Sequence, residues 1–344
     1  MKKIYAFLTV VFACITLSVY AQPQANQQGP RPQGPREDRR TKVIIDNDLC
    51  GDADGLFALA HQLLCKSINI RGIVGAHLGS RGGFTNAANT AQASVERAEE
   101  ILAALGMSGQ VKVVPGATEK MEKPDQPKDS EGARLIIEEA LQCTPERPLY
   151  VLVGGPLTDI ASALLINPEI SKNIIVVWIG GQEYDFGHQK PWGGISEVEY
   201  NLNLSIPAGQ MIFNDSDVRL WQIPRDAYRR CLYGLDEIEL KIKPYGKIGA
   251  YLYEALGGMK RFASKEEYVL GDSPLVLMSS LQTFFEPDTA SSDFVEINAP
   301  RMTDEGLYDF SKTGRKIRVY TEIDTALMFR DMETKIQLHA RNAQ

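Results

Sequence analysis

The feature that most constrains this 344-residue chain is a short apolar run that leads directly into a cluster of acidic residues. Residues 43–45, Val-Ile-Ile, predict a buried strand, and residues 56–64 have the apolar spacing of a following helix. The turn between these elements carries Asp46, Asp48, Asp52 and Asp54. Open α/β sheets bind ligands at the carboxyl ends of their strands. We therefore expect this turn to hold something positively charged.

Strands and helices are predicted to alternate along the rest of the chain. Further strands are expected at residues 68–75, 111–114, 149–153, 174–179, 219–223 and 318–321, with helical patterns between several of them. This rhythm predicts an α/β fold with an open, largely parallel sheet flanked by helices, as in Rossmann-like proteins. Residues 233–270 are expected to be largely helical, and Ser273 is expected to cap a helix that starts at Pro274.

The first 21 residues have the pattern of a signal peptide. Lys2 and Lys3 precede the apolar segment 4–17, and Val19-Tyr20-Ala21 is a plausible cleavage site. Residues 22–41, rich in Gln, Pro, Gly and Arg, predict a flexible linker, and residues 42–344 a single α/β domain. We therefore expect an exported protein, periplasmic or extracellular, without stable membrane insertion. Lipoprotein anchoring through Cys14 is less favoured, because the residues before it fit that signal poorly.

Charge and cysteine content narrow the possible partners. Lys and Arg number 37 against 44 Asp and Glu, which gives a net charge of −7 and no dense basic segment. Nucleic acid is therefore not an expected partner, whereas a homo-oligomer stays possible. After the predicted cleavage site the chain keeps Cys50, Cys65, Cys143 and Cys231. Their spacing matches neither a metal site nor a disulfide framework, so we expect them to be small buried side chains.

The acidic turn itself suggests chemistry. Carboxylates crowded at one strand end repel one another unless a cation or shared protons relieve the repulsion. Hard oxygen ligands in a loop suit Ca²⁺ or Mg²⁺ rather than Zn²⁺. An alternative is that Asp46-Asn47-Asp48, placed after an apolar strand, resembles the haloacid-dehalogenase-like phosphatases. In that interpretation Asp46 is the nucleophile, although Cys50 stands where Thr or Val is usual.

Four separated segments carry a second and more specific pattern. They are IIDNDLCGDADGLFALA at residues 44–60, VGGPLTDIA at 153–161, EYNLNLSIPAGQMIF at 199–213 and GDSPLVL at 271–277. In this order they resemble the inosine/uridine-preferring nucleoside hydrolase family. Each segment alone is a weak match, but together they span the predicted domain.

The resemblance implies a calcium-dependent N-ribohydrolase that acts on a small-molecule riboside. Asp48 takes the place of the residue that binds calcium and accepts a proton from the attacking water. Asp272 and the backbone carbonyl of Gly154 take the places of further calcium ligands. Glu199 and Asn201 match the residues that hold the ribose hydroxyls. The fold that the resemblance implies is the same open α/β sheet.

The chain departs from the family pattern in the acidic loop. The family has two adjacent aspartates there, one for the metal and one for the ribose, whereas Ala53 or Gly55 replaces one of them here. Asp52 and Asp54 are therefore both candidate metal ligands, and Asp52 is also a candidate ribose ligand.

The second departure concerns the leaving group. The family's histidine before the late aspartate is Gly271 here, so another acid is needed. His188 is a hypothesis for this role, because its loop also carries Trp192, whose ring suits stacking on an aromatic leaving group. A solvated loop histidine is the other interpretation. His77, near the end of the second predicted strand, is either a pocket residue or a packed or solvated one. An exported riboside-binding protein without turnover is therefore a further alternative.

Overall fold

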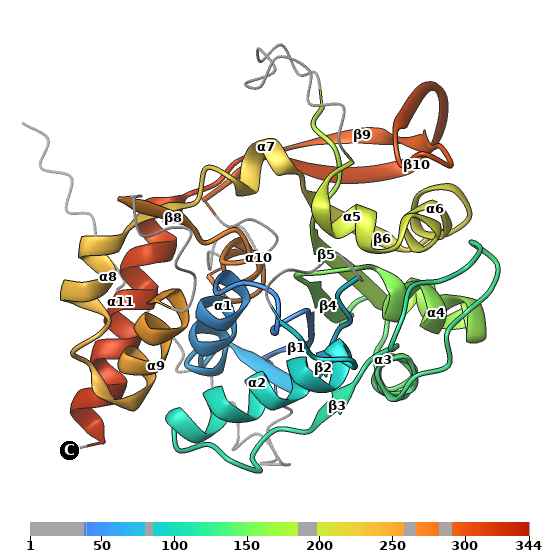
Figure 1. Cartoon of the computed structure of the whole chain (residues 1–344). Coiled ribbons are helices and arrows are strands. Elements are labelled where there is room, and N and C mark those ends of the chain that lie inside the picture. Colours follow the sequence, from blue (N-terminus) through green and yellow to red (C-terminus); the bar gives the residue numbers. More distant parts are fainter. Residues whose placement is uncertain are drawn as a thin grey trace, which may run out of the picture. The chain divides into compact units, whose positions relative to one another are not determined.

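The computed structural model describes residues 38, 40–79, 85–184, 198–257, 266–281 and 291–343. The predicted signal peptide and nearly all of the predicted linker lie outside these residues and stay predictions. Among the helices of the described part, none combines the length and the apolar run that crossing a bilayer requires. The described residues from Arg40 onward are built around one eight-stranded sheet (Figure 1).

The sheet confirms the predicted open, largely parallel α/β fold. Its strand order is β3-β2-β1-β4-β5-β6-β10-β9, and every neighbouring pair is parallel except β9 and β10. The strands are β1 (Thr41–Asn47), β2 (Ile68–Gly75), β3 (Val113–Pro115), β4 (Leu149–Val153), β5 (Ile174–Ile179), β6 (Arg219–Ile223), β9 (Asp293–Met302) and β10 (Tyr308–Glu322).

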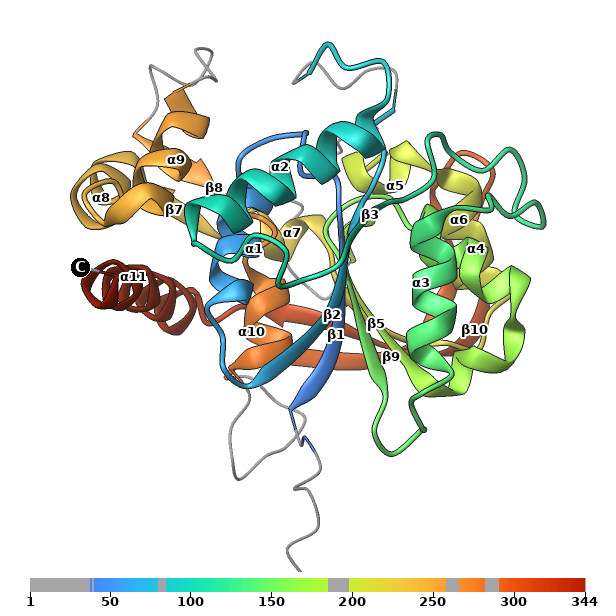
Figure 2. The same ribbon diagram turned by 90° about the horizontal axis from the view of Figure 1, so that it is seen from below.

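Helices cover both faces of this sheet (Figure 2). They are α1 (Asp54–Leu63), α2 (Thr90–Ala104), α3 (Glu131–Ala140), α4 (Thr158–Ile166), the 3₁₀ turn η1 (Pro168–Asn173), α5 (Tyr200–Leu204), α6 (Ile206–Asn214), α7 (Arg225–Tyr228), α8 (Leu235–Lys241), α9 (Gly246–Gly257), α10 (Pro274–Ser280) and α11 (Thr325–Asn342). Two short strands, β7 (Leu232–Gly234) and β8 (Glu267–Val269), form a separate antiparallel pair.

Strand β1 shows how the sequence builds the two layers. Val43 and Ile45 belong to the apolar cluster shared with α1, α10 and α11, whereas Ile44 belongs to the cluster shared with α3, α4 and α6. All three side chains are fully buried. Burying such a side chain contributes about 2 kcal/mol, so β1 is fixed in the middle of the core. The acidic turn therefore follows one of the most constrained strands.

Three local predictions differ from the structure. The prediction that residues 233–270 are largely helical missed the short strands β7 and β8. Strands of three residues are too short to show an apolar period. The predicted strand at 318–321 is only the end of β10, whose exposed polar half pairs with β9, a strand that the sequence prediction did not contain. Ser273 makes no capping hydrogen bond, although Pro274 does open α10.

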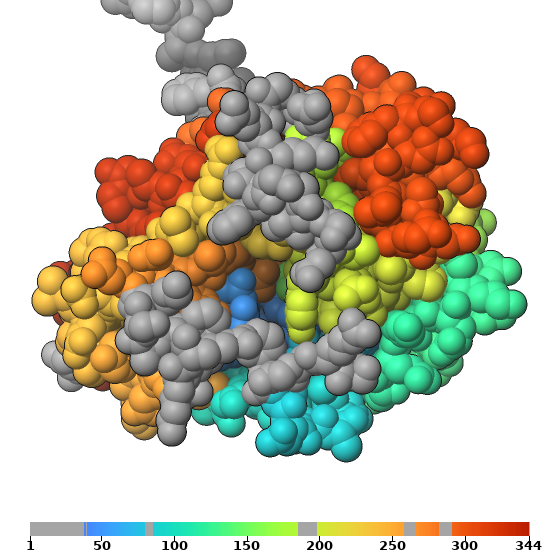
Figure 3. All heavy atoms as spheres, turned by 45° about the horizontal axis from the view of Figure 1, so that its top comes forward, coloured from blue at the N-terminus to red at the C-terminus, as the bar shows by residue number. Residues whose placement is uncertain are grey.

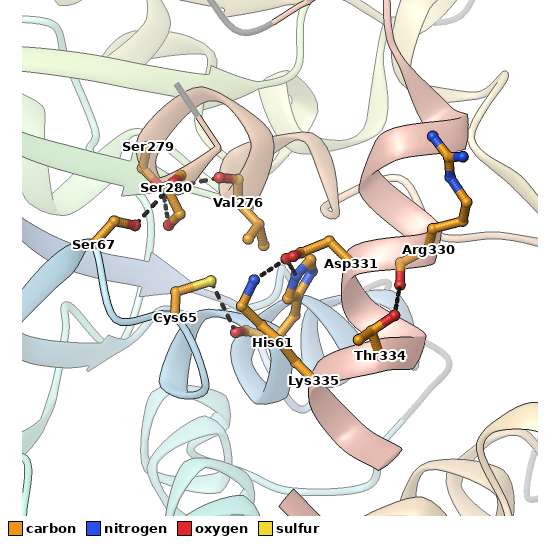
Figure 4. Close-up of polar contacts among 10 residues, drawn as sticks. All are labelled: His61, Cys65, Ser67, Val276, Ser279, Ser280, Arg330, Asp331, Thr334 and Lys335. Carbon is orange, nitrogen blue, oxygen red and sulfur yellow. Dashed lines mark hydrogen bonds and ion pairs between the residues drawn. The ribbon is translucent and has the colours of Figure 1, made fainter. Parts of the chain in front are cut away.

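Helix α1 is held at its carboxyl end by a polar contact with α11 (Figure 4). The Nε2 atom of His61 lies 2.7 Å from an Asp331 oxygen, and His61 is fully buried. The Lys335 ammonium forms an ion pair with the same carboxylate oxygen. The four cysteines expected to be buried are all buried free thiols, as the sequence predicted.

Candidate active site

The described part of the chain contains a pocket at the point where the strand order reverses. From β1 the chain proceeds to β2 on one side, while β4 lies on the other side. A cavity of about 220 Å³ opens at the carboxyl ends of these strands, where such sheets bind ligands. Its lining residues are Asp48, Gly51, Asp52, Asp54, Gly154, Ile179, Glu199, Tyr200, Asn201, Tyr228 and Asp272. Figure 3 shows the blue segment near residue 50 in a hollow between yellow-green and orange segments.

The acidic loop is anchored by its neighbours. The Gly51 amide donates to the Asp48 carbonyl at 2.7 Å, which closes a tight turn. The Cys50 amide donates to Ser94 Oγ, and the Cys50 thiol donates to the Thr90 carbonyl, both at 3.2 Å. Because Thr90 and Ser94 belong to α2, the loop is tied to a helix that the sheet already holds. Asp48 is thereby presented to the pocket on a fixed backbone.

Asp272 reaches the same pocket from a distant part of the chain. The side-chain amide of Asn47 donates to an Asp272 oxygen at 2.8 Å, and both residues are buried. Gly154 lies against this pair, since a Cβ at residue 154 would come within 2.7 Å of the same Asp272 oxygen. Only glycine therefore lets the backbone after β4 approach the carboxylate so closely.

The first turn of α1 completes the acidic wall. Asp54 is the first residue of the helix, and one of its carboxylate oxygens accepts the Gly55 amide at 2.8 Å. Its other oxygen lies 3.1 Å from where a Cβ of residue 271 would be. Asp54 therefore faces the segment that carries Asp272, whereas Asp52 lies on the loop before the helix and also lines the pocket.

Burial and, to a smaller extent, mutual repulsion raise the pKa values of the pocket carboxylates. Burial is the largest cause and raises the pKa of Asp48 and of Asp54 well above the usual range, although both side chains keep some exposure. The charges of Asp272 and Asp52 raise both values further. Burial also raises the pKa of Asp272 to about 8, against the opposing effect of the Asn47 hydrogen bond. The described lining residues include no Lys, Arg or His to balance this charge.

Glu199 and Asn201 form the opposite wall, after β5. The Glu199 side chain caps α5 by accepting the amides of Asn201 and Leu202, at 3.1 and 3.0 Å. The Asn201 side-chain amide donates to the Ile179 carbonyl at 2.9 Å, which fixes the side chain at the end of β5. Burial raises the pKa of Glu199, while hydrogen bonds from backbone amides and from Tyr228 oppose this shift.

Several candidate residues lie elsewhere. Asp46, the nucleophile of the phosphatase alternative, is fully buried and does not line the pocket, so the structure argues against a phosphatase. His77 is buried with its Nε2 atom 2.8 Å from Thr158 Oγ1, which makes it a packed histidine. His188 and Trp192 lie outside the described residues, and their roles stay hypotheses.

Two pocket features were not foreseen from the sequence. Tyr228 lines the pocket and donates its hydroxyl to Glu199 at 2.7 Å, but it comes from α7, where no motif marks it. Asn47 orients Asp272, and its position between two aspartates at the end of β1 is the only sequence signal for this role.

The pocket carboxylates do not form a compact group of three ligand atoms among the described residues. Within the described part of the chain, one group of three His, Cys or acidic side chains brings its ligand atoms within 4.8 Å, and it consists of His61, Cys65 and Asp331. That group lies at the other end of α1, where Lys335 already neutralises Asp331 (Figure 4).

Fold and site together define an α/β protein whose ligand pocket presents carboxylates and an amide at the strand ends. The chain matches the sequence profile described as "Inosine-uridine preferring nucleoside hydrolase" over residues 43–330. It therefore belongs to the inosine-uridine preferring nucleoside hydrolase family, as the sequence motifs indicated, and is a hydrolase that acts on N-glycosyl compounds. No curated protein matches the chain at a significant level.

Solved structures agree with this fold. A purine-preferring ribonucleoside hydrolase from Gardnerella vaginalis aligns with a TM-score of 0.67 and 19% identity, over 88% of this chain and 100% of that chain. An inosine-uridine preferring nucleoside hydrolase from Bacillus anthracis aligns with a TM-score of 0.61 and 16% identity, over 86% and 99%. A plant nucleoside hydrolase, PpNRh1, gives 0.66 and 14%, over 86% and 99%. At such identities these likenesses concern the fold alone.

Proposed function

We propose that the protein is a calcium-dependent hydrolase that cleaves the N-glycosidic bond of ribonucleosides or related ribosides, releasing the free base and ribose. The observation that carries this proposal is the pocket at the switch point of the sheet. There Asp48, Asp52, Asp54 and Asp272 line one cavity, and no basic side chain is among its described lining residues. Family membership supports the reaction class, and the charge of the pocket supports the cation.

The donor set fits a hard cation. Every acidic group in the pocket offers carboxylate oxygens, and no His or Cys is among the described lining residues. Asp48, Asp272 and either or both of Asp52 and Asp54 would hold calcium, together with the Gly154 carbonyl. The close approach of the Gly154 backbone to Asp272 supports this last ligand. Oxygen ligands of this number and kind suit calcium better than zinc. Calcium, when bound, lowers the pKa of a water and grips a sugar diol.

The roles of the side chains follow from charge and position. Asp48, at the end of β1, accepts the proton of the water whose oxygen adds to the anomeric carbon of the sugar. The bond between that carbon and the base nitrogen breaks, and its electron pair leaves with the base. Neighbouring carboxylates stabilise the positive charge that develops on the sugar. Asn201 and Asp52 both line the cavity and are proposed to bind sugar hydroxyls.

Protonation of the departing base needs an acid. Gly271 provides none, and among the described lining residues there is no histidine. His188 is proposed as this acid and Trp192 as a stacking partner for the base, both from the loop that follows β5. A His188→Ala variant with unchanged turnover and pH profile would remove His188 from the mechanism.

A reducing-sugar assay on a panel of purine and pyrimidine nucleosides tests the proposal. Sugar release is expected in calcium and is expected to stop when a chelator removes the metal. Replacement of Asp129 by Asn is a matched control, because this exposed carboxylate does not line the pocket. Hydrolysis that continues unchanged in chelator would overturn the metal-dependent mechanism.

The absence of an evident leaving-group acid also favours a second candidate, an exported binding protein that keeps the pocket without turnover. It predicts that nucleosides raise the melting temperature without any sugar release. Sugar release from one member of the panel would exclude it.

A further inference from the structure

A largely buried ion pair lies behind the pocket wall that carries Glu199. The Arg225 guanidinium donates two hydrogen bonds to the Glu183 carboxylate, from Nε at 2.6 Å and from Nη2 at 2.8 Å. The two side chains are 14% and 17% exposed. Burial opposes ionisation of Glu183, but the hydrogen bond from Arg225 outweighs it and lowers the pKa of this carboxyl. Two parallel hydrogen bonds fix the plane of the guanidinium as well as its position, which a lysine ammonium cannot do. We call this ion pair the clamp.

The clamp joins the segments that leave two neighbouring strands. Glu183 follows β5, and Arg225 is the first residue of α7, which follows β6. The Arg225 backbone amide also donates to the Gly181 carbonyl at 3.2 Å. Helix α7 ends with Tyr228, which lines the pocket. The clamp therefore holds the short helix that brings Tyr228 to the pocket.

Arg225 also reaches the backbone of Glu199 through one intermediate side chain. Its Nη2 atom donates to the Gln182 side-chain oxygen at 3.1 Å, and the same oxygen accepts the Glu199 amide at 3.2 Å. Gln182 and Glu199 are both buried. The Glu199 carboxylate in turn accepts the Tyr228 hydroxyl at 2.7 Å. These contacts form a closed ring, because Tyr228 belongs to the same helix as Arg225.

Two oxygens on this wall can accept a hydroxyl from a sugar. The Tyr228 hydroxyl gives its proton to Glu199 and keeps its lone pairs. The Asn201 side-chain nitrogen donates to the Ile179 carbonyl, which orients the amide and keeps its oxygen as an acceptor. Both side chains line the pocket. Glu199 places both, since its carboxylate also accepts the Asn201 backbone amide at 3.1 Å.

We propose that Arg225 is a positioning residue, which holds Glu199 and its hydrogen-bond partners where they accept the hydroxyls of a ribose. This inference rests on the proposed hydrolase function. Arg225 does not line the pocket, so it acts on a substrate only through this wall. A displacement of about 1 Å at such a wall is enough to lower the rate up to about a hundredfold.

The test measures kcat/KM in calcium for one ribonucleoside and for its 2′-, 3′- and 5′-deoxy forms. Arg225→Lys keeps the charge but loses the planar fork, so kcat/KM for the ribonucleoside is expected to fall about tenfold or more. The deoxy form that lacks the hydroxyl bound by this wall is expected to lose less. The ratio of kcat/KM for the ribonucleoside to kcat/KM for that deoxy form is therefore expected to fall about fivefold. A lower amount of folded protein would not change this ratio.

Arg230→Lys is the matched control, because Arg230 pairs with Glu322 at the surface and does not line the pocket. Its substrate ratios are expected to equal those of the wild type. Glu183→Gln weakens the clamp from the other side and is expected to lower the same ratio as Arg225→Lys. Combining the two changes is expected to be no worse than Arg225→Lys alone, because both act on one contact.

An equal loss for all four substrates in Arg225→Lys, or no loss at all, overturns this inference and leaves the hydrolase function intact. If Arg225→Lys does not fold, Glu183→Gln decides, and unchanged ratios in that variant overturn the inference. No sugar release from any substrate by the wild-type protein overturns the hydrolase function itself, and the positioning role of Arg225 with it.

Discussion

The two ends of helix α1 carry charged clusters of opposite design. At its amino end, Asp54 joins Asp48 and Asp272 in a pocket whose described lining residues include no basic group. At its carboxyl end, His61 lies 2.7 Å from Asp331, and Lys335 forms an ion pair with the same carboxylate. Both clusters join segments that are distant in sequence. One cluster holds its own counter-charge, and the other lacks it.

This difference separates a structural contact from a functional one. The carboxyl-end cluster satisfies Asp331 within the protein, so it can hold α11 against α1 without a ligand. At the amino end, burial raises the pKa of Asp272 to about 8, which means that the ionised carboxylate is costly there. Only an external cation or bound protons relieve this cost. Uncompensated charge in a cleft is typical of a functional site.

The largest expected difference between the two ends is in catalysis. Asp48→Asn removes the proposed proton acceptor and a metal ligand, so we expect kcat to fall by at least about a thousandfold. Asp331→Asn is expected to leave kcat within about threefold, because Asp331 does not line the pocket. Sugar release at saturating calcium measures both values. Similar losses in the two variants would mean that the clusters are not functionally distinct.

The second contrast is in stability at acid pH, between the buried histidines His77 and His61. Burial lowers the pKa of His77 to about 4 from an ordinary value of 6.5, and its partner is a hydroxyl rather than a carboxylate. The folded state therefore resists protonation of His77. The contribution of this residue to the free energy of unfolding is fully present above pH 6.5 and is lost as the pH falls towards 4. The loss amounts to about 3 kcal/mol for 2.5 pH units.

Urea denaturation of wild type and His77→Gln at pH 7 and pH 4 measures this loss. The variant is expected to lose less stability on acidification, since Gln does not titrate. Burial also lowers the pKa of His61, but its hydrogen bond to Asp331 opposes the shift. Equal losses in wild type and His77→Gln would contradict the assignment to His77.

Asp331 is the common partner of His61 and Lys335 at the carboxyl end of α1. Asp331→Ala leaves His61 and Lys335 without their common partner, so we expect a loss of about 2 kcal/mol in the free energy of unfolding. Urea denaturation at neutral pH gives the value. An additional Lys335→Met change is expected to recover part of the loss, because it removes the remaining charge. If the free energy of unfolding falls no more than in a variant with an exposed substitution such as Asp129→Asn, the contact does not stabilise the packing of α11 on α1.

The smallest expected effect is a gain in stability, at the amino end of α1. In calcium-free buffer at neutral pH, Asp272→Asn is expected to stabilise the protein by about 1 kcal/mol, because burial raises the pKa of Asp272 to about 8, so this carboxyl must take up a proton on folding and an amide need not. In calcium the same variant is expected to be less stable than wild type, since it loses a ligand. Thermal unfolding with and without calcium tests both. Destabilisation in both buffers would argue against uncompensated charge at this end.

Sequence patterns were sufficient to locate those pocket residues that come directly after a strand. The apolar runs 43–45 and 149–153 predicted that the acidic loop and Gly154 lie at strand ends, and the motif with Asp272 was expected at the start of a helix. The largely parallel sheet follows from the alternation of strands and helices, whereas the strand order was not predicted. What the patterns did not contain was contact between distant segments. Tyr228 and Asn47 act through residues far along the chain, Glu199 and Asp272, and local periodicity holds no trace of such pairs.

Strands β9 and β10 were missed or shortened for a different reason. Much of β10 is exposed and polar, so its pairing with β9 shows little apolar alternation. The Asp52 and Asp54 assignment also stayed open in the sequence, because both lie within one short loop. The structure puts both on the pocket wall.

Cys50 gives the acidic loop a natural chemical reporter. Its thiol is buried and donates to a backbone carbonyl of α2, so a thiol reagent can reach it only when the loop leaves that helix. The rate of modification therefore measures how often the loop opens, without any substrate or turnover. Protection of this single sulfur by calcium would record the ordering of the pocket directly, molecule by molecule, in a mass spectrometer.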